Sequence, residues 1–215
     1  HVEVVDPAPQ PLGRLLPPAA AAALRDALAG LGVHWHFGTS VKSVNRHNGG
    51  YRASLSDGSA IDTDVVLSAI GLRPRITLAA SAGINTRRGI VTDQHLQTDA
   101  ADVYALGDCA EVAGLVLPFV MPIMHAARAL ARTLNGVSTA VQYPAMPVVV
   151  KTPALPVVIC PPPMNASGAW QESGAGADVR SVFLGPDNAL LGFALTGSAN
   201  AEKNALVKQL PPVLA

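Results

Sequence analysis

Two apolar runs of strand length, each closed by a glycine, constrain the fold most. Val65–Ile70 leads directly into Gly71, and Val103–Leu106 leads into Gly107 and Asp108. A short apolar run that ends at a turn residue is typical of a strand buried on both faces. Such strands form the parallel sheets of α/β proteins, which bind ligands at the carboxyl ends of their strands. The sequence therefore predicts an α/β fold.

Helix and strand patterns alternate along the first 140 residues. Strand patterns occur at Val2–Asp6, at Val33–Phe37, and at Ser40–Asn45 and Tyr51–Leu55, which flank a hairpin turn at His47–Gly50. Helix patterns occur at Ala19–Ala29, Ile76–Ala82 and Pro122–Leu134. After residue 140 proline becomes frequent, and the patterns change to short strands and one short helix. They are Val148–Val150, Val157–Ile159, Val179–Leu184, Leu190–Thr196 and the helix Ala201–Leu210. We expect residues 1–71, 72–140 and 141–215 to be separate parts, the last a small α+β domain.

Composition excludes several classes of function. The chain carries 15 basic and 15 acidic side chains, so nothing in its charge favours a nucleic-acid or anionic membrane partner. No apolar run reaches the length of about 18 residues that a membrane span needs. Cys109 and Cys160 lie far apart without zinc-site spacing, so no metal site is predicted. Two reduced thiols suit a reducing compartment, which favours the cytoplasm, and a single disulfide is the alternative.

The string Thr98–Asp108 is the most specific functional motif. Its short apolar strand would bring the backbone to the carboxyl edge of a sheet, where ligands bind. Gly107 has no side chain, so a ligand can approach its backbone closely. Asp108 offers a carboxylate that accepts hydrogen bonds from a polyol hydroxyl. We predict that Gly107 and Asp108 bind a cofactor; a buried strand followed by an ordinary turn is the alternative.

Three further positions belong to strand or helix ends. Val120 opens the helix that follows the motif, and unpaired N–H groups at a helix start form an anion site. Asp6 ends a strand, where dinucleotide-binding folds place the acid that binds the adenosine ribose and favours NAD over NADP. A simple turn residue is the alternative for Asp6. Lys151 follows an apolar strand, and its ammonium either reaches solvent or lies beside a cofactor ring.

Together these segments resemble the FAD-dependent pyridine-nucleotide reductases, and among them the reductases of rubredoxin. The resemblance extends over nearly the whole chain. It rests on Gly71–Arg75, Thr98–Asp108, Tyr104–Val112, Val120–Leu134 and Val150–Pro153. Related ferredoxin reductases usually carry a tryptophan near the start of the helix after Asp108, and this sequence has none between Asp108 and Leu134.

The resemblance implies a partial FAD/NAD-binding fold of the glutathione-reductase type, with a small C-terminal α+β domain. Residues 1–71 would be the C-terminal half of the NAD-binding domain, and residues 72–140 the C-terminal half of the FAD-binding domain. Residues 141–215 would be the C-terminal domain. The resemblance also implies that the glycine-rich phosphate loops precede His1. We therefore expect this chain to be a piece of a longer polypeptide that by itself binds neither cofactor well and is inactive.

The function implied by the resemblance is electron transport, from NADH through FAD to rubredoxin. Asp108 would bind the ribityl chain of FAD, Val120 would contact the flavin through its backbone, and Lys151 would lie beside the flavin. A helix start aimed at the flavin would stabilise its reduced form, which carries negative charge. A ferredoxin reductase or an NADH oxidase fits the same motifs. A cofactor-free interaction module derived from this fold stays open as well.

Overall fold

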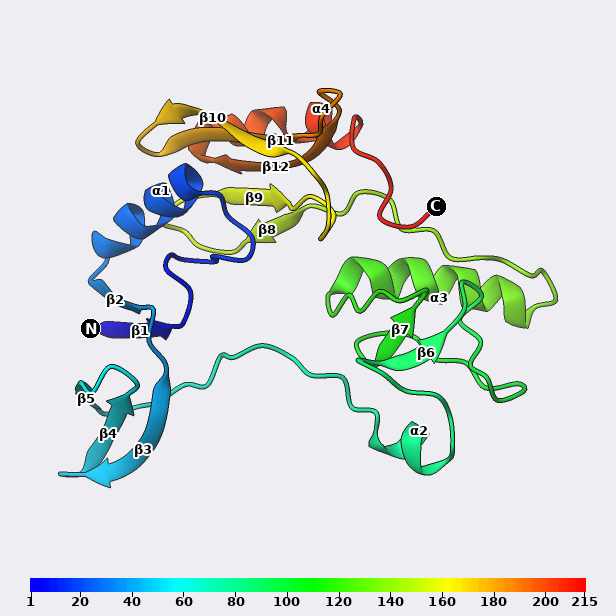
Figure 1. Cartoon of the computed structure of the whole chain (residues 1–215), viewed down its shortest axis with the longest axis horizontal. Coiled ribbons are helices and arrows are strands. Elements are labelled where there is room, and N and C mark those ends of the chain that lie inside the picture. Colours follow the sequence, from blue (N-terminus) through cyan, green and yellow to red (C-terminus); the bar gives the residue numbers. More distant parts are fainter. The chain divides into compact units, whose positions relative to one another are not determined.

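The computed structural model describes residues 1–215. The chain folds into two compact units, and each unit gathers separate stretches of sequence. Unit 1 contains His1–Ser68 and Pro147–Pro211, and unit 2 contains Ala69–Met146 and Pro212–Ala215. Figure 1 labels the helices and strands of both units. None of the helices has the length and apolar character needed to cross a bilayer.

The first part of unit 1 contains two small sheets. Strand β1 (Val2–Asp6) pairs in parallel with β2 (Val33–Phe37), as predicted for both strands. A three-stranded antiparallel sheet follows, made of β3 (Val41–His47), β4 (Gly50–Leu55) and β5 (Ala60–Thr63). Asn48 and Gly49 both have positive φ in the β3–β4 turn, at 48° and 86°. This backbone suits a two-residue hairpin, so the predicted turn is confirmed.

Helix α1 (Pro18–Ala29) confirms the helix predicted at Ala19–Ala29. It begins where sequence rules place a start, because Pro17 is extended and Pro18 occupies the first helical position. Gly30 ends it. The buried residues of α1 are three alanines and a leucine: Ala20, Ala21, Ala23 and Leu24. Small side chains let α1 approach a sheet closely.

The C-terminal part of unit 1 is a five-stranded antiparallel sheet in the order β10-β11-β12-β9-β8. Its strands are β8 (Val148–Val150), β9 (Val157–Cys160), β10 (Ala169–Ala175), β11 (Asp178–Leu184) and β12 (Leu190–Thr196). Helix α1 packs against β11 and β12, and its buried residues share one core with Val157, Ile159 and Ala194. The first and last parts of the sequence thus build one hydrophobic core.

The edge strand β10 was not expected, because its largely polar, exposed segment lacks an apolar alternation. The helix predicted at Ala201–Leu210 is wrong in form and extent. A 3-10 helix spans Gly197–Glu202, and the short helix α4 spans only Lys203–Val207. The Gly197 N–H and the Asn200 side-chain amide both donate to the Pro156 carbonyl, at 3.0 and 2.9 Å. These two bonds hold the segment in the tighter winding.

Unit 2 places two short parallel strands beside a long helix. Strands β6 (Ile90–Thr92) and β7 (Ala110–Val112) pair with each other. Helices α2 (Thr77–Ser81) and α3 (Val120–Leu134) confirm the two predicted helices. The buried residues of α3 are Pro122, Ala126 and Ala129, whose spacing of four and three places them on one face. That face contributes to a core with β7, and the C-terminal Leu214 packs against it.

Both glycine-closed apolar runs fail to form the buried strands predicted for them. Val65–Ile70 belongs to no strand, and Ile70 is 91% exposed. Figure 1 shows this segment as an extended coil between β5 and α2. Val103–Leu106 makes only an isolated bridge, between Tyr104 and Gln97. An apolar run forms a strand only where a neighbouring segment supplies a ladder of hydrogen bonds. No segment pairs with Val65–Ile70, and residues 96–98 supply only two backbone hydrogen bonds to Val103–Leu106.

Candidate functional site

The Gly107–Asp108 segment forms an open turn in unit 2. Gly107 has a φ of +88°, which strongly favours glycine, and a Cβ built there would meet nothing within 4 Å. Its carbonyl accepts a hydrogen bond of 3.0 Å from the N–H of Ala110, the first residue of β7. The Asp108 side chain is exposed and has no hydrogen bond or ion pair to the protein. Its carboxylate is therefore available to an external hydroxyl group.

The start of α3 lies at the same place in unit 2. Phe119 precedes the helix in an extended conformation, and no side chain caps the first turn. The N–H groups of Val120 and Met121 have no partner within the helix, because the first N–H groups of any helix lack one. Pro122 has no N–H. The Val120 side chain is 70% exposed. The open turn at Gly107 and an uncapped helix start thus belong to one site.

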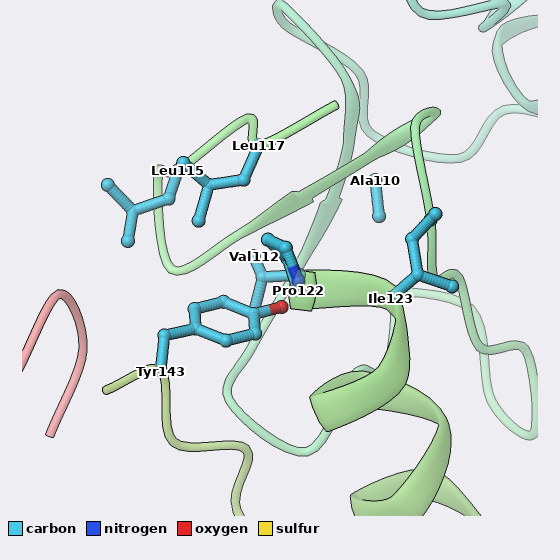
Figure 2. Close-up of a pocket in the computed structure, with 8 residues that line it drawn as sticks. Ala110, Val112, Leu115, Leu117, Pro122, Ile123 and Tyr143 are labelled. Carbon is cyan, nitrogen blue, oxygen red and sulfur yellow. The ribbon is translucent and has the colours of Figure 1, made fainter. Parts of the chain in front are cut away.

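A narrow pocket joins these two elements, and Figure 2 shows the residues around it. Gly107 and Ala110 line it from the turn and β7, and Pro122 and Ile123 line it from α3. The remaining lining residues are Val112, Leu115, Leu117 and Tyr143. Its volume is about 10 Å³, close to the space of one water molecule. The pocket lies between the turn and the start of α3, and it is too small to hold a ring system.

Tyr143 is the residue of this site that the sequence interpretation missed. It is 3% exposed, and Figure 2 shows its hydroxyl pointing toward the start of α3 beside Pro122. Burial raises the pKa of the Tyr143 phenol above its usual value, so the group is a neutral O–H donor at pH 7. Its backbone is held by Leu214, whose carbonyl accepts from the Tyr143 N–H at 2.9 Å. The alternation of Val141, Gln142 and Tyr143 was the sequence signal that could have revealed this burial.

Asp6 and Lys151 lie in unit 1. Asp6 ends β1, and its Oδ1 accepts a hydrogen bond of 2.8 Å from the Ala8 N–H. The turn therefore uses one carboxylate oxygen and leaves the other available. Lys151 follows β8, is exposed, and makes no hydrogen bond or ion pair. The structure thus places Gly107, Asp108 and Val120 in unit 2, where Gly107 and the first turn of α3 line one pocket, while Asp6 and Lys151 belong to unit 1.

Comparison with known proteins identifies two families along the chain. Residues 1–141 match the family described as "Pyridine nucleotide-disulphide oxidoreductase". Residues 140–210 match the family described as "Rubredoxin binding C-terminal domain". The boundary between the two matches falls just after α3, near the point at which proline becomes frequent in the sequence.

Two relatives illustrate the similarity in sequence. The chain is 52% identical to a rubredoxin-NAD(+) reductase of Alcanivorax borkumensis, over 99% of this chain and 56% of that protein. It is 40% identical to a nitric oxide reductase FlRd-NAD(+) reductase of Aeromonas salmonicida, over 98% of this chain and 55% of that protein. The chain thus spans just over half the length of these relatives.

A solved structure illustrates the similarity in fold. A ferredoxin reductase from Rhodopseudomonas palustris superposes on 98% of this chain and 55% of its own, with a TM-score of 0.84 and 22% identity. At that identity the comparison bears on the fold alone. The predicted FAD/NAD-binding fold is confirmed, since solved pyridine nucleotide-disulphide oxidoreductases share it.

Proposed function

The chain belongs to the pyridine nucleotide-disulphide oxidoreductase family, and from this premise we propose that it is part of an NADH-dependent flavoprotein that reduces rubredoxin. The match to a rubredoxin-binding domain over residues 140–210 supports rubredoxin as the acceptor. The identity of 52% to a rubredoxin-NAD(+) reductase supports the same reaction. The sequence contains only two cysteines, far apart and without the dense spacing of a disulfide framework, which suits a reducing compartment and supports a cytoplasmic location.

The residues of the unit 2 site fit FAD. A ribityl chain presents hydroxyl donors, and the Asp108 carboxylate is exposed and has no protein partner. The space beside Gly107 is open, so a bulky ligand can approach the backbone there. The first N–H groups of α3 suit the end of a flavin that gains negative charge on reduction. The exposed, unpaired Asp108 beside the uncapped helix start is the observation that carries the proposal.

Bound FAD would accept a hydride from NADH and release electrons singly to an iron protein. This chain contributes binding, orientation and electrostatics to that chemistry. Asp108 holds the ribityl chain and so fixes the position of the ring. The α3 start, through the Val120 and Met121 N–H groups, favours the reduced state by placing partial positive charge nearby. No side chain of this region has to transfer a proton in the hydride step.

The three parts of the chain take separate roles in this proposal. Residues 1–71 belong to the NAD side, residues 72–140 to the flavin side, and residues 141–215 to the acceptor side. Asp6 is the acid that accepts hydrogen bonds from the ribose of NADH, using the carboxylate oxygen that the Ala8 turn leaves available. Lys151 is exposed and makes no hydrogen bond or ion pair, so its ammonium is available to a flavin, the role that the resemblance to the family implies for it.

The flavin site is tested by Asp108→Ala in the flavin-loaded protein that carries this chain. A hydrogen bond to a charged group contributes about 1.5–3 kcal/mol, so we expect FAD affinity to fall roughly ten- to hundredfold. Asp64→Ala is the matched control, because Asp64 is also exposed and makes no hydrogen bond or ion pair. Flavin fluorescence during titration of the apoprotein measures both constants. Equal FAD affinity in the two variants would refute the assignment of Asp108.

The nucleotide site is tested by Asp6→Asn, which keeps an oxygen acceptor for the Ala8 N–H and removes the negative charge. We expect kcat/KM for NADH to fall and the preference for NADH over NADPH to narrow. An unchanged preference would leave Asp6 as a turn residue.

The Lys151→Met variant tests the other unit 1 residue. If the Lys151 ammonium acts on the flavin, its loss should lower the midpoint potential of the flavin, whereas an unchanged potential means that Lys151 only reaches solvent.

The electron acceptor is tested by comparing reduction rates with rubredoxin, ferredoxin and dioxygen under the same NADH concentration. The proposal expects rubredoxin to be reduced fastest by a clear margin. The 40% identity to a nitric oxide reductase FlRd-NAD(+) reductase makes the electron carrier of that system a second candidate acceptor. A well-folded protein that binds neither flavin nor NADH would instead favour a cofactor-free interaction module.

A further inference from the structure

We propose that Glu111 is a positioning residue for the flavin site. Glu111 lies at the middle of β7, three residues after Asp108, and its carboxylate locks a neighbouring turn against the backbone that carries Asp108. The inference rests on the proposed binding of FAD at Asp108. It adds a residue outside the pocket lining and a mechanism by which the exposed turn is held in place.

The Glu111 carboxylate is buried and fully used by one short segment. Its side chain is 4% exposed, and its Oε1 lies 2.9 Å from Nη2 of Arg87. Its Oε2 accepts hydrogen bonds from the backbone N–H groups of Arg88 at 3.0 Å and Gly89 at 3.2 Å. A buried carboxylate is costly unless it is paired and hydrogen-bonded, and here the turn at residues 87–89 supplies all three partners.

The same turn is pressed against the backbone of residues 109–111. A Cβ at Gly89 would lie 2.8–2.9 Å from the Glu111 nitrogen, the Ala110 carbonyl carbon and the Cys109 oxygen. The Ile90 N–H donates to the Cys109 carbonyl at 2.8 Å. The backbones of residues 87–90 and 109–111 therefore pack in direct contact, a region we call the tight layer. The hydrogen bonds of the Glu111 carboxylate hold the two segments together.

We call the contacts between Glu111 and the turn at residues 87–89 the clamp, and the Arg88 side chain extends the clamp to the loop after β7. Its Nη2 donates to the Gly114 carbonyl at 2.8 Å, while its backbone N–H donates to Glu111. Arg88 thus holds both ends of a short stretch that begins at Glu111. The turn at residues 87–89 is fixed to β7 and to the loop that follows it.

The clamp reaches Asp108 through a single turn of backbone. Ala110 donates its N–H to the Gly107 carbonyl at 3.0 Å, so residues 107–110 form a hydrogen-bonded turn from which the Asp108 side chain projects into solvent. The end of this turn at Ala110 is held by its pairing with Ile90. The Asp108 side chain is exposed and makes no hydrogen bond or ion pair, so its position depends chiefly on this backbone. Loss of the Glu111 oxygen that accepts from the Arg88 and Gly89 N–H groups should therefore loosen Asp108.

The experiment compares Glu111→Ala and Glu111→Gln in the flavin-loaded protein. A glutamine Oε1 can still accept from the Arg88 and Gly89 N–H groups, whereas alanine leaves both unpaired. The glutamine NH2 cannot accept from Arg87, but the Arg87 side chain is 62% exposed and can turn to solvent. We expect FAD affinity to fall about tenfold in the alanine variant and less than about threefold in the glutamine variant. The visible circular dichroism of the bound flavin should change in the alanine variant and stay native in the glutamine variant. If Glu111→Ala does not fold, Glu111→Asp takes its place, with an expected loss of about threefold or more because the shorter side chain cannot reach both N–H groups.

Val141→Ala is the control for simple destabilisation. Val141 is fully buried in the core that also contains Ala110 and Val112, the two neighbours of Glu111, and it does not line the pocket. It should lower the melting temperature while FAD affinity and flavin dichroism stay native. Equal FAD affinity in the Glu111→Ala and Val141→Ala variants would overturn the inference, as would equal losses in the alanine and glutamine variants. If Asp108→Ala itself leaves FAD binding native, the proposed flavin site is wrong; if it weakens binding and Glu111→Ala does not, only the role of Glu111 is wrong.

Discussion

Gly89→Ala should destabilise the protein although glycine is not needed there for its backbone angles. The φ of Gly89 lies outside the positive region, so a left-handed backbone is not what disfavours alanine there. The added Cβ would instead lie 2.8–2.9 Å from three backbone atoms of residues 109–111. Carbon contacts are favourable at about 3.5–4.0 Å, so β6 and β7 would have to separate by roughly 0.7 Å. That movement would stretch the hydrogen bond from the Ile90 N–H to the Cys109 carbonyl and the two backbone hydrogen bonds that Glu111 accepts.

Overpacking of this kind costs about 1–3 kcal/mol, which corresponds to a fall of roughly 2–12 °C in melting temperature for a chain of this size. Differential scanning calorimetry of the native protein and the Gly89→Ala variant measures this difference in melting temperature. Gly30→Ala is the matched control, because Gly30 has a φ of −61° and its Cβ would meet only the Ala27 oxygen, at 3.5 Å. That variant should be as stable as the native protein or more so, by up to about 1 kcal/mol. A Gly89→Ala protein that melts at or above the native temperature would show that the tight layer is not required.

Two further predictions concern contacts between distant parts of the sequence. Glu172 on β10 accepts hydrogen bonds from the Ala19 N–H of α1 and from the Ser181 hydroxyl, so it caps α1 from another part of the chain. Glu172→Ala should cost about 1 kcal/mol in urea unfolding, Glu172→Gln clearly less, and equal losses would contradict the capping role. The raised pKa of Tyr143 means that the unfolded chain loses its phenolic proton before the folded protein does. The contribution of Tyr143 to stability is therefore constant below about pH 10 and falls as the pH rises above that value. Tyr143→Phe should reduce this alkaline loss of stability, measured as the unfolding midpoint at each pH. The same slope of midpoint against pH in both proteins would exclude a contribution from Tyr143.

The sequence predicted the elements whose signals are local. The start and end of α1 follow from prolines and a glycine in its own segment, and the β3–β4 hairpin follows from Asn48 and Gly49. The candidate site at Gly107 and Asp108 also follows from local signals, because the glycine turn and the carboxylate are neighbours in the chain, and its ligand stays a prediction. Backbone preference and turn chemistry are properties of a few consecutive residues, and they survive without knowledge of the rest of the fold.

Tertiary structure decided the features that need a partner far along the chain. Val65–Ile70 has the composition of a buried strand and is exposed, because hydrophobicity cannot supply a neighbouring ladder. The burial of Tyr143 depends on contacts with Leu214 and with the core around α3. Glu111 reads as an ordinary surface acid until the fold brings the Arg87–Gly89 turn against it. Pairing and burial are set by which segments meet, and that information is distributed over the whole chain rather than contained in any one stretch of it.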